Sequence, residues 1–115
     1  MVCVQLFVLP SLKTIEFSTN QLTGSIPTEI GQASLLKKID LSSNQLDGII
    51  PSELGLLQEL TSLELHKNAF KGISMPDEIC DLKLENPAFD ELSSDCLASL
   101  TAPDVNCTCC TICYE

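Results

Sequence analysis

The sequence has few basic residues, few aromatic residues and no long apolar run. Its 115 residues include 6 lysine or arginine against 16 aspartate or glutamate residues, for a formal net charge of −10. Because a chain this acidic repels phosphate backbones and anionic lipid surfaces, we expect no nucleic-acid partner and no binding to such surfaces. No apolar run approaches the roughly 18–20 residues that span a bilayer. Membrane attachment would therefore require parts of a longer chain.

Residue patterns typical of catalysis are also scarce. His66 is the only histidine, and its neighbour Ser42, one strand away, is too slight a coincidence to indicate a catalytic pair. We expect His66 to be an ordinary surface residue. No glycine-rich phosphate loop occurs, and no pocket is apparent that would separate the pKa values of paired carboxylates. The sequence predicts no enzyme activity, no cofactor and no metal.

Hydrophobic residues, by contrast, make up 44% of the chain, and glycine and proline number only 5 and 6. This composition excludes a disordered polar tail and a collagen-like chain. The charge is uneven, because residues 1–72 carry −2 and residues 73–115 carry −8. The chain therefore changes character near residue 73.

A repeat of about 24 residues dominates the first two thirds of the chain. Columns at this spacing are formed by Asn20, Asn44 and Asn68; by Ile15, Ile39 and Leu63; by Phe17, Leu41 and Leu65; and by Gly24, Gly48 and Gly72. The step Ile26-Pro27 matches Ile50-Pro51, and Pro27-Thr-Glu-Ile-Gly31 returns, one residue displaced, as Pro76-Asp-Glu-Ile-Cys80. Since a unit this short cannot bury its own apolar face, successive coils must stack on a shared core.

Each column has a physical explanation. The alternation in Ile39-Asp-Leu41 predicts a half-buried strand, and stacked coils place such strands side by side in a parallel sheet. The asparagines are expected inside the turns, where they bond backbone groups that no strand partner reaches. Gly24 and Gly48 suit a positive φ angle or a close backbone approach. Pro27 and Pro51 stiffen the return segment.

The pattern Leu-x-x-Leu-x-Leu-x-x-Asn-x-Leu-x-Gly-x-Ile-Pro resembles the leucine-rich-repeat family and its plant-type subclass. The resemblance implies an α/β solenoid: a short right-handed array with a parallel β-sheet on its concave face and a loop-rich, cysteine-rich C-terminal cap. Residues 1–80 are interpreted as repeats, with a partial repeat at 1–8 followed by about three coils of the same period. Residues 81–115 are interpreted as the cap.

The amino terminus fits the same period. Val2 and Leu6 fall on the columns of Ile26 and Ile30 when shifted by one full repeat, so the repeat explains this apolar segment better than a signal peptide does. We therefore expect the chain to be the carboxy-terminal part of a longer solenoid. The alternative is a short natural protein closed by residues 1–8.

Cysteines concentrate at the other end. The disulfide candidates are Cys80, Cys96, Cys107, Cys109, Cys110 and Cys113. Six cysteines pair in fifteen ways, so the sequence leaves the connectivity open. The rival hypothesis is a zinc site within Cys107-x-Cys-Cys-x-x-Cys113, but structural zinc usually draws two ligand pairs from a longer loop. Disulfides are favoured, and Asn106-Cys-Thr108 is a candidate glycosylation site that agrees with a secreted protein.

This cysteine-rich segment resembles the ends of leucine-rich-repeat proteins from diatoms and related algae, which implies an extracellular or cell-surface setting. Within it, residues 89–95 are interpreted as one more degenerate coil ending in a strand, followed by irregular structure. The spacing of Phe89, Leu92, Cys96, Leu97 and Leu100 also fits one face of a helix.

The exposed strand positions are the candidate binding residues. They are Thr14, Glu16, Ser18, Lys38, Asp40, Ser42, Ser62, Glu64 and His66. Glu16, Asp40 and Glu64 form one column, in which like charges about 5 Å apart repel by roughly 1 kcal/mol. Such a stripe is interpreted either as a site for a basic peptide or cation, or as a solvated surface offset by neighbouring lysines. No aromatic residue is expected there, so sugar binding by this piece alone is doubtful.

These observations predict a protein- or peptide-binding module, the C-terminal part of a secreted or cell-surface leucine-rich-repeat protein of the receptor-like or inhibitor-like kind. The competing hypothesis gives the cysteine-rich end a structural, thiol or metal-binding role, with the repeats as a spacer.

Overall fold

The computed structural model describes residues 9, 11–71, 75–95 and 109–114. Its elements are β1 (Thr14–Glu16), β2 (Thr23–Gly24), the 3-10 helix η2 (Thr28–Gln32), β3 (Lys38–Asp40), β4 (Gln45–Leu46), the 3-10 helix η3 (Ser52–Leu56), β5 (Ser62–Glu64), α1 (Asp77–Glu85), β6 (Glu91–Asp95) and β7 (Ile112–Tyr114). The first coil runs from β1 through η2, the second from β3 through η3, and the third from β5 through α1. The repeating unit of the sequence is thus also the unit of the structure.

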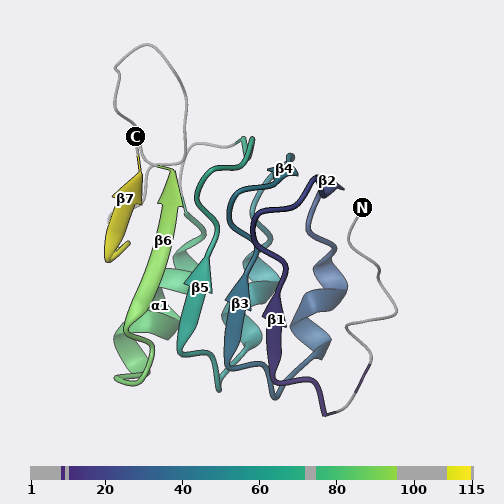
Figure 1. Cartoon of the computed structure of the whole chain (residues 1–115). Coiled ribbons are helices and arrows are strands. Elements are labelled where there is room, and N and C mark those ends of the chain that lie inside the picture. The colour runs from purple at the N-terminus through teal and green to yellow at the C-terminus, as the bar shows by residue number, and fades with distance from the viewer. Residues whose placement is uncertain (1–8, 10, 72–74, 96–108, 115) are drawn as a thin grey trace.

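The strands of successive coils form one parallel sheet in the order β1-β3-β5-β6-β7 (Figure 1). Ile15 pairs with Ile39, which in turn pairs with Leu63. Leu92 of β6 continues the same row. A second, two-stranded parallel sheet joins β2 to β4. The predicted ladder of adjacent, same-direction strands is confirmed.

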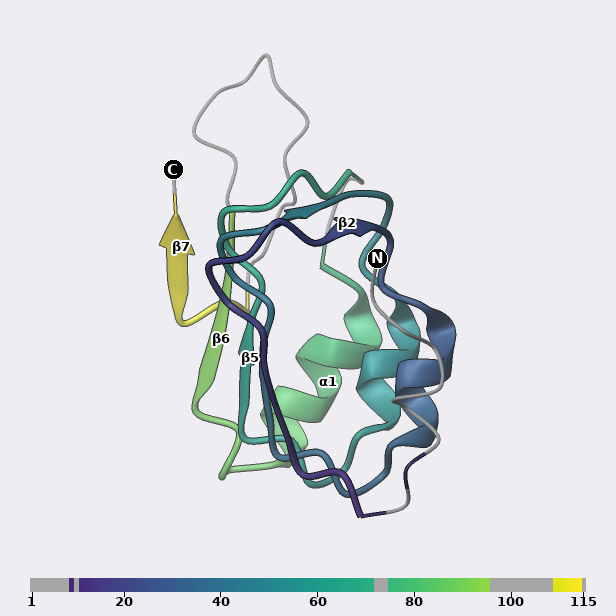
Figure 2. The same ribbon diagram turned by 45° about the vertical axis from the view of Figure 1, so that its right-hand side comes forward.

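The core lies between the large sheet and the return helices, which Figure 2 shows on one side of the strands. Its fully buried side chains include Ile30, Leu36, Ile39, Leu54, Leu57, Leu60, Leu63, Ile79 and Leu92. Each such aliphatic side chain contributes about 1.5–3 kcal/mol by leaving water. Because every coil supplies only a few of them, the coils hold one another together.

One member of a core column departs from the pattern. Leu41 and Leu65 are buried, but Phe17 keeps 37% of its surface exposed. Phe17 follows β1, the first strand of the sheet, and no described strand lies on the far side of β1. The column is therefore covered only where a neighbouring coil stands on both sides.

The turn after each strand is held by its asparagine, as predicted. Asn44 donates its side-chain N–H to the carbonyl oxygens of Phe17 and Leu41, at 2.9 and 3.1 Å, and accepts the backbone N–H of Leu22 at 3.0 Å. Asn68 repeats these bonds between the second and third coils. The side chains satisfy backbone groups that the sheet leaves unpaired, and they link each coil to the one before it.

Glycine and proline set the path of the return segment. Gly24 and Gly48 have φ angles of +84° and +71°, which confirms the predicted positive φ at both positions. Gly55 serves another purpose, because an added Cβ there would lie 2.7 Å from the Cβ of Glu78 in α1. This glycine lets the helices of adjacent coils approach closely. Pro27 and Pro51 directly precede η2 and η3, where a missing N–H costs nothing.

The equivalent of Gly55 in the third coil is Cys80, on the last helix of the described stack. Cys80 forms a disulfide with Cys109, at a sequence separation of 29. The space that a neighbouring helix occupies beside the glycines is thus used in the third coil for a covalent link to the C-terminal segment.

The C-terminal part contributes regular structure to the solenoid. Residues 91–95 form strand β6, so the interpretation of this segment as a further coil is confirmed and the alternative helix over these residues is wrong. Strand β7 adds a further parallel neighbour. The predicted boundary between the repeats and the cap, at residues 80 and 81, falls inside α1. This division into two parts stays a prediction. None of the described helices has the length and apolar composition of a membrane span.

Candidate functional site on the strand face

The strand face is the side of the large sheet that points away from η2, η3 and α1. On each of the first three strands the middle residue is buried and the flanking residues face outward, as the burial of Ile15 between Thr14 and Glu16 shows. Sheet register places these flanking positions in two rows. One row is Thr14, Lys38, Ser62 and Glu91, and the other is Glu16, Asp40, Glu64 and Ser93.

The predicted acidic column therefore exists, with a lysine beside it. The ammonium of Lys38 lies 3.2 Å from a carboxylate oxygen of Glu16, and both side chains are well exposed. A hydrogen bond and the charge of Glu16 raise the pKa of Lys38. Because this ion pair is open to solvent, it positions charge on the face more than it stabilises the fold.

The side chain of Asp40 is held by hydrogen bonds within its own coil. Its carboxylate accepts the hydroxyl of Ser42 at 2.6 Å and the backbone N–H of Ser42 at 3.1 Å. Partial burial raises the pKa of Asp40, but the bonds from Ser42 and Ser18 outweigh burial and leave that pKa below its usual value. The hydroxyl bonds hold this carboxylate in its ionised form.

Glu64, in the same column, has a pKa that is shifted the other way. Burial raises its pKa, and the charges of Asp40 and Glu91 raise it further. The repulsion expected between like charges on adjacent strands therefore falls mainly on Glu64. Glu64 pairs with Asp40 on one neighbouring strand, and Glu91 lies on the other, so carboxylates flank Glu64 from both sides.

Two predicted exposed residues are buried. Ser42 and His66 retain only 5% and 9% of their surface. Ser42 folds back on Asp40, and the imidazole Nδ1 of His66 lies 2.8 Å from the hydroxyl of Ser93. The expectation that His66 is an ordinary surface residue is wrong, because β6 supplies a buried partner for its ring. Burial lowers the pKa of His66, while the charges of Asp95 and Asp40 oppose that change.

The contact between His66 and Ser93 does not form a usable nucleophile. Ser93 is 0% exposed, so no substrate reaches its hydroxyl. A catalytic serine must be reachable by the reacting carbon as well as bonded to its base. The pair packs β5 against β6. Nearby, the hydroxyl of Ser62 is buried without a hydrogen-bond partner in the described part of the chain.

Sequence reasoning did not find Glu91, Ser93 or Asp95. They lie on β6, whose register follows β5 at a longer interval than the regular repeat, since Leu63 pairs with Leu92. The apolar spacing of Phe89 and Leu92 was visible, but the insertion that contains α1 hid the alignment. One longer repeat aligns Leu92 with Leu63, which puts Glu91 in the row of Ser62 and Ser93 in the row of Glu64.

The cysteine candidates are partly within the described residues. Cys80 and Cys109 are joined, and Cys110 is disulfide-bonded as well. Cys96, Cys107 and the glycosylation candidate Asn106 lie outside the described residues, and Cys113 lies on β7. Within the described part of the chain no three histidine, cysteine, aspartate or glutamate residues gather as a metal site would require.

Comparison with known proteins accounts for this geometry. The family described as Leucine Rich Repeat matches residues 11–33 and 35–57, the first two coils. The fold is a leucine-rich-repeat solenoid. No curated protein matches the sequence.

Several of the solved structures that are similar to this chain are ectodomains of plant receptors. The complex titled PEPR1-AtPEP1 is 46% identical, with a TM-score of 0.66, over 69% of this chain. The ectodomain of the Arabidopsis receptor kinase HAESA, in complex with an IDA peptide hormone, is 36% identical over 65% of this chain, with a TM-score of 0.62. The ectodomain of the Arabidopsis thaliana receptor kinase SOBIR1 is 25% identical over 83% of this chain, with a TM-score of 0.71.

The chain spans only part of these solenoids. It covers 11% of the PEPR1 chain, 13% of the HAESA chain and 51% of the SOBIR1 chain. The similarity therefore concerns a few consecutive coils. The resemblance of the cysteine-rich end to diatom proteins stays a prediction.

Proposed function

We propose that the strand face binds a protein or peptide that presents a basic group. The observation that carries this proposal is the position of Asp40, Glu64 and Glu91 on three adjacent strands, where Asp40 pairs with Glu64 and Glu91 pairs with Ser62. Burial raises the pKa of Glu64, and the charges of Asp40 and Glu91 raise it further. A lysine or arginine of a partner placed beside Glu64 would relieve that repulsion. Lys38, paired with Glu16, leaves the carboxylates around Glu64 as the acidic part of the face.

Similarity to receptor ectodomains supports a binding role without catalysis. One similar structure holds a peptide hormone, and another is a complex of two receptor proteins, titled BIR3 - SERK2, that is 34% identical over 70% of this chain. The solenoid places hydroxyls and carboxylates in a shallow, regular array, a surface suited to an extended peptide. The binding residues of the proposal are Thr14, Glu16, Ser18, Lys38, Asp40, Ser62 and Glu64, together with the buried Ser42 and His66. Ser42 positions Asp40, and His66 contacts Ser93 on the next strand.

The same proposal places the protein in the secretory pathway or on the cell surface. Disulfides persist in oxidising compartments, and Cys80–Cys109 joins α1 to the C-terminal segment. We propose that this link closes the carboxy-terminal end of the core as a cap. Retention of zinc with free thiols in non-reducing mass spectrometry would instead support the rival thiol or metal-binding role.

Selection of a random displayed peptide library on the full 115-residue chain tests the binding proposal. The selected peptides are expected to be rich in lysine and arginine, and to bind more weakly as salt is raised. The double variant Glu64→Gln with Glu91→Gln removes two of these three carboxylates while keeping the size of both side chains. It should weaken the selected peptides at least about tenfold, which corresponds to about 1.4 kcal/mol.

The matched control is the double variant Glu59→Gln with Glu85→Gln, which makes the same change of net charge at exposed sites outside the face. It should leave binding within about twofold, a difference of about 0.4 kcal/mol. Equal losses in both double variants would show that only total charge matters. Peptides without basic residues, or affinity unchanged by the face variants, would contradict the proposal.

A further inference from the structure

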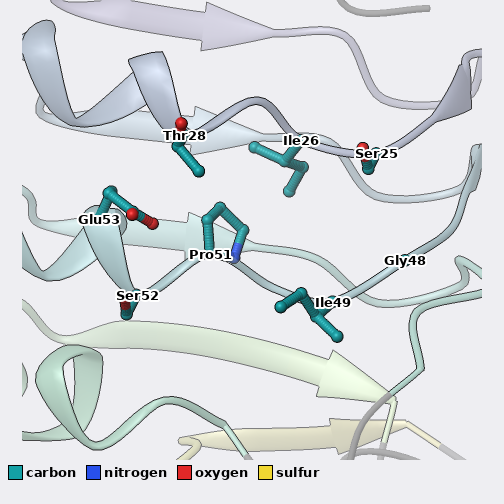
Figure 3. A pocket seen from close by; sticks show the side chains of 8 residues that line it. All are labelled: Ser25, Ile26, Thr28, Gly48, Ile49, Pro51, Ser52 and Glu53. Carbon is teal, nitrogen blue, oxygen red and sulfur yellow. The ribbon is translucent and has the colours of Figure 1, made fainter.

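A groove of about 450 Å³ lies on another side of the solenoid, where the first and second coils leave the small sheet and enter η2 and η3. It is lined by Ser25, Ile26, Thr28, Gly48, Ile49, Pro51, Ser52 and Glu53. These residues come from the two Gly-x-Ile-Pro steps and the helix starts that follow them, and none belongs to the strand face. Figure 3 shows Ile26 and Thr28 of one coil facing Pro51 and Glu53 of the next.

The groove exists because the residues on one side of it have small side chains. The residue after the turn glycine is Ser25 in the first coil and Ile49 in the second. Gly48 has no side chain, and a Cβ there would lie 3.1 Å from the Cβ of Ser25. The groove is therefore open beside Ser25 and Gly48, which have little or no side chain. Ile49 is the one bulky side chain beside them.

The chemistry of the lining is divided between an apolar floor and a polar rim. Ile26 and Pro51 are buried beneath the groove, whereas Ile49 leaves 69% of its surface in water. Serine and threonine hydroxyls stand at the rim, and Glu53 supplies the only charge among the lining residues. The groove therefore offers one exposed aliphatic side chain, two buried apolar residues beneath it and a single carboxylate to a docked segment.

Charge complementarity selects the occupant. No basic side chain is among the described residues that line the groove, and the whole chain carries −10, so an acidic segment would be repelled while a basic one is attracted. The same lining residues include no aromatic side chain on which a sugar could stack. A segment with one aliphatic side chain followed by a cationic one satisfies both Ile49 and Glu53.

We propose that this groove docks an extended segment of a protein partner, with an aliphatic side chain over Ile26 and Pro51 and a lysine or arginine against Glu53. It is a second contact surface, separate from the strand face. A solenoid that binds one partner through its strands would thereby hold another along its side.

Amide chemical shifts of the full-length ¹⁵N-labelled chain provide the test. The probe is the tetrapeptide acetyl-Gly-Leu-Lys-Gly-amide, and the comparison probe carries glutamate in place of lysine. The lysine probe should cause saturable shifts confined to the non-proline amides of residues 24–28 and 48–53. The glutamate probe should bind at least threefold more weakly. Glu53→Gln should abolish the difference between the two probes.

A variant that fills the groove distinguishes binding in the groove from non-specific binding elsewhere on the surface. Ser25→Leu should abolish the saturable shifts, while Ser34→Leu, which adds the same side chain at an exposed serine outside the groove, should leave them unchanged. Thermal unfolding of both variants verifies that each is folded. Binding that survives Ser25→Leu, or that is equal for both probes, would overturn the proposal. Shifts at the same amides that depend on protein concentration alone would replace it with self-association, and saturation by cellobiose would replace it with a carbohydrate site.

Discussion

The carboxylate of Asp95 accepts the backbone N–H of Asn68 at 3.0 Å, and it also accepts the N–H of Lys67 at 2.7 Å. One coil earlier, the N–H groups of Ser43 and Asn44 are accepted by the backbone carbonyls of His66 and Lys67. Asp95 thus replaces, with one side chain, the carbonyls that a further identical coil would supply. Asp95 therefore ends the series of turn-to-turn hydrogen bonds between successive coils, and it leaves neither of these two N–H groups unpaired.

Replacement of this carboxylate should destabilise the fold. Asp95→Ala leaves two backbone donors without their charged acceptor, which is expected to lower the free energy of unfolding by about 1.5–3 kcal/mol. Chemical denaturation measures the loss. Asp90→Ala removes the same charge from an exposed position next to β6 and should cost less than about 0.5 kcal/mol. Equal costs would contradict the role of Asp95 as a ladder end.

The asparagine column should not respond uniformly to alanine. Asn44 bonds backbone groups of two coils, whereas the side-chain N–H of Asn20, within the described part of the chain, bonds carbonyls of its own coil. We expect Asn44→Ala to cost about 2–4 kcal/mol, since several partly buried backbone groups lose partners, and Asn20→Ala to cost less than about 1 kcal/mol. Thermal and urea unfolding of the two variants compares them directly. A similar cost at both positions would mean that the bonds between coils add little.

Asp40 and Glu64 should respond to neutralisation with opposite signs. The pKa of Asp40 is lowered in the folded chain, so its ionised form contributes stability above its usual value of 3.8, and this is lost as the pH falls. The pKa of Glu64 is raised, so its ionised form opposes folding at neutral pH. Asp40→Asn is therefore expected to lower the free energy of unfolding by about 1 kcal/mol, and Glu64→Gln to raise it slightly, by less than about 1 kcal/mol. Unfolding at pH 7 decides, and a loss in both variants would contradict the assignment.

His66 should make stability depend on mild acid. Its pKa is lowered in the folded chain, so as the pH falls below the usual 6.5 the unfolded chain takes up a proton first, and stability declines. His66 is the only histidine, and no other side chain with an ordinary pKa titrates between about 5.5 and 7. The melting temperature of the wild-type chain should therefore fall over this range more steeply than that of His66→Gln. Parallel curves would contradict the buried, neutral imidazole.

The disulfide should matter more than any single core contact. Cys80–Cys109 closes a loop with a sequence separation of 29, for which chain entropy gives about 3–4 kcal/mol. The double variant Cys80→Ser with Cys109→Ser is expected to lose about that amount in chemical denaturation. Ser34→Ala, at an exposed serine of the first coil, serves as the control. A double variant as stable as the control would mean that α1 and the C-terminal strand are held by packing alone.

Much of the fold could be predicted because the interactions that form it lie within one coil or between neighbouring coils, and they repeat along the chain. The spacing of Ile15, Ile39 and Leu63 fixes which strands are neighbours, and the turn glycines and asparagines act within one coil and the next. Regularity of this kind is carried by the sequence itself. The prediction failed where the unit changes length, since the longer third coil with α1 moved β6 out of the simple period.

The sequence by itself determined the stacked coils, the parallel ladder and the acidic column, because each follows from residue types repeated at one spacing. Only the tertiary structure decided what those residues do. Serine donors make Asp40 a structural anion while Glu64 remains repelled, β6 buries His66, and Asp95 ends the ladder. These outcomes depend on which side chains meet across different coils, and burial and hydrogen bonding act on that proximity, which no single repeat specifies.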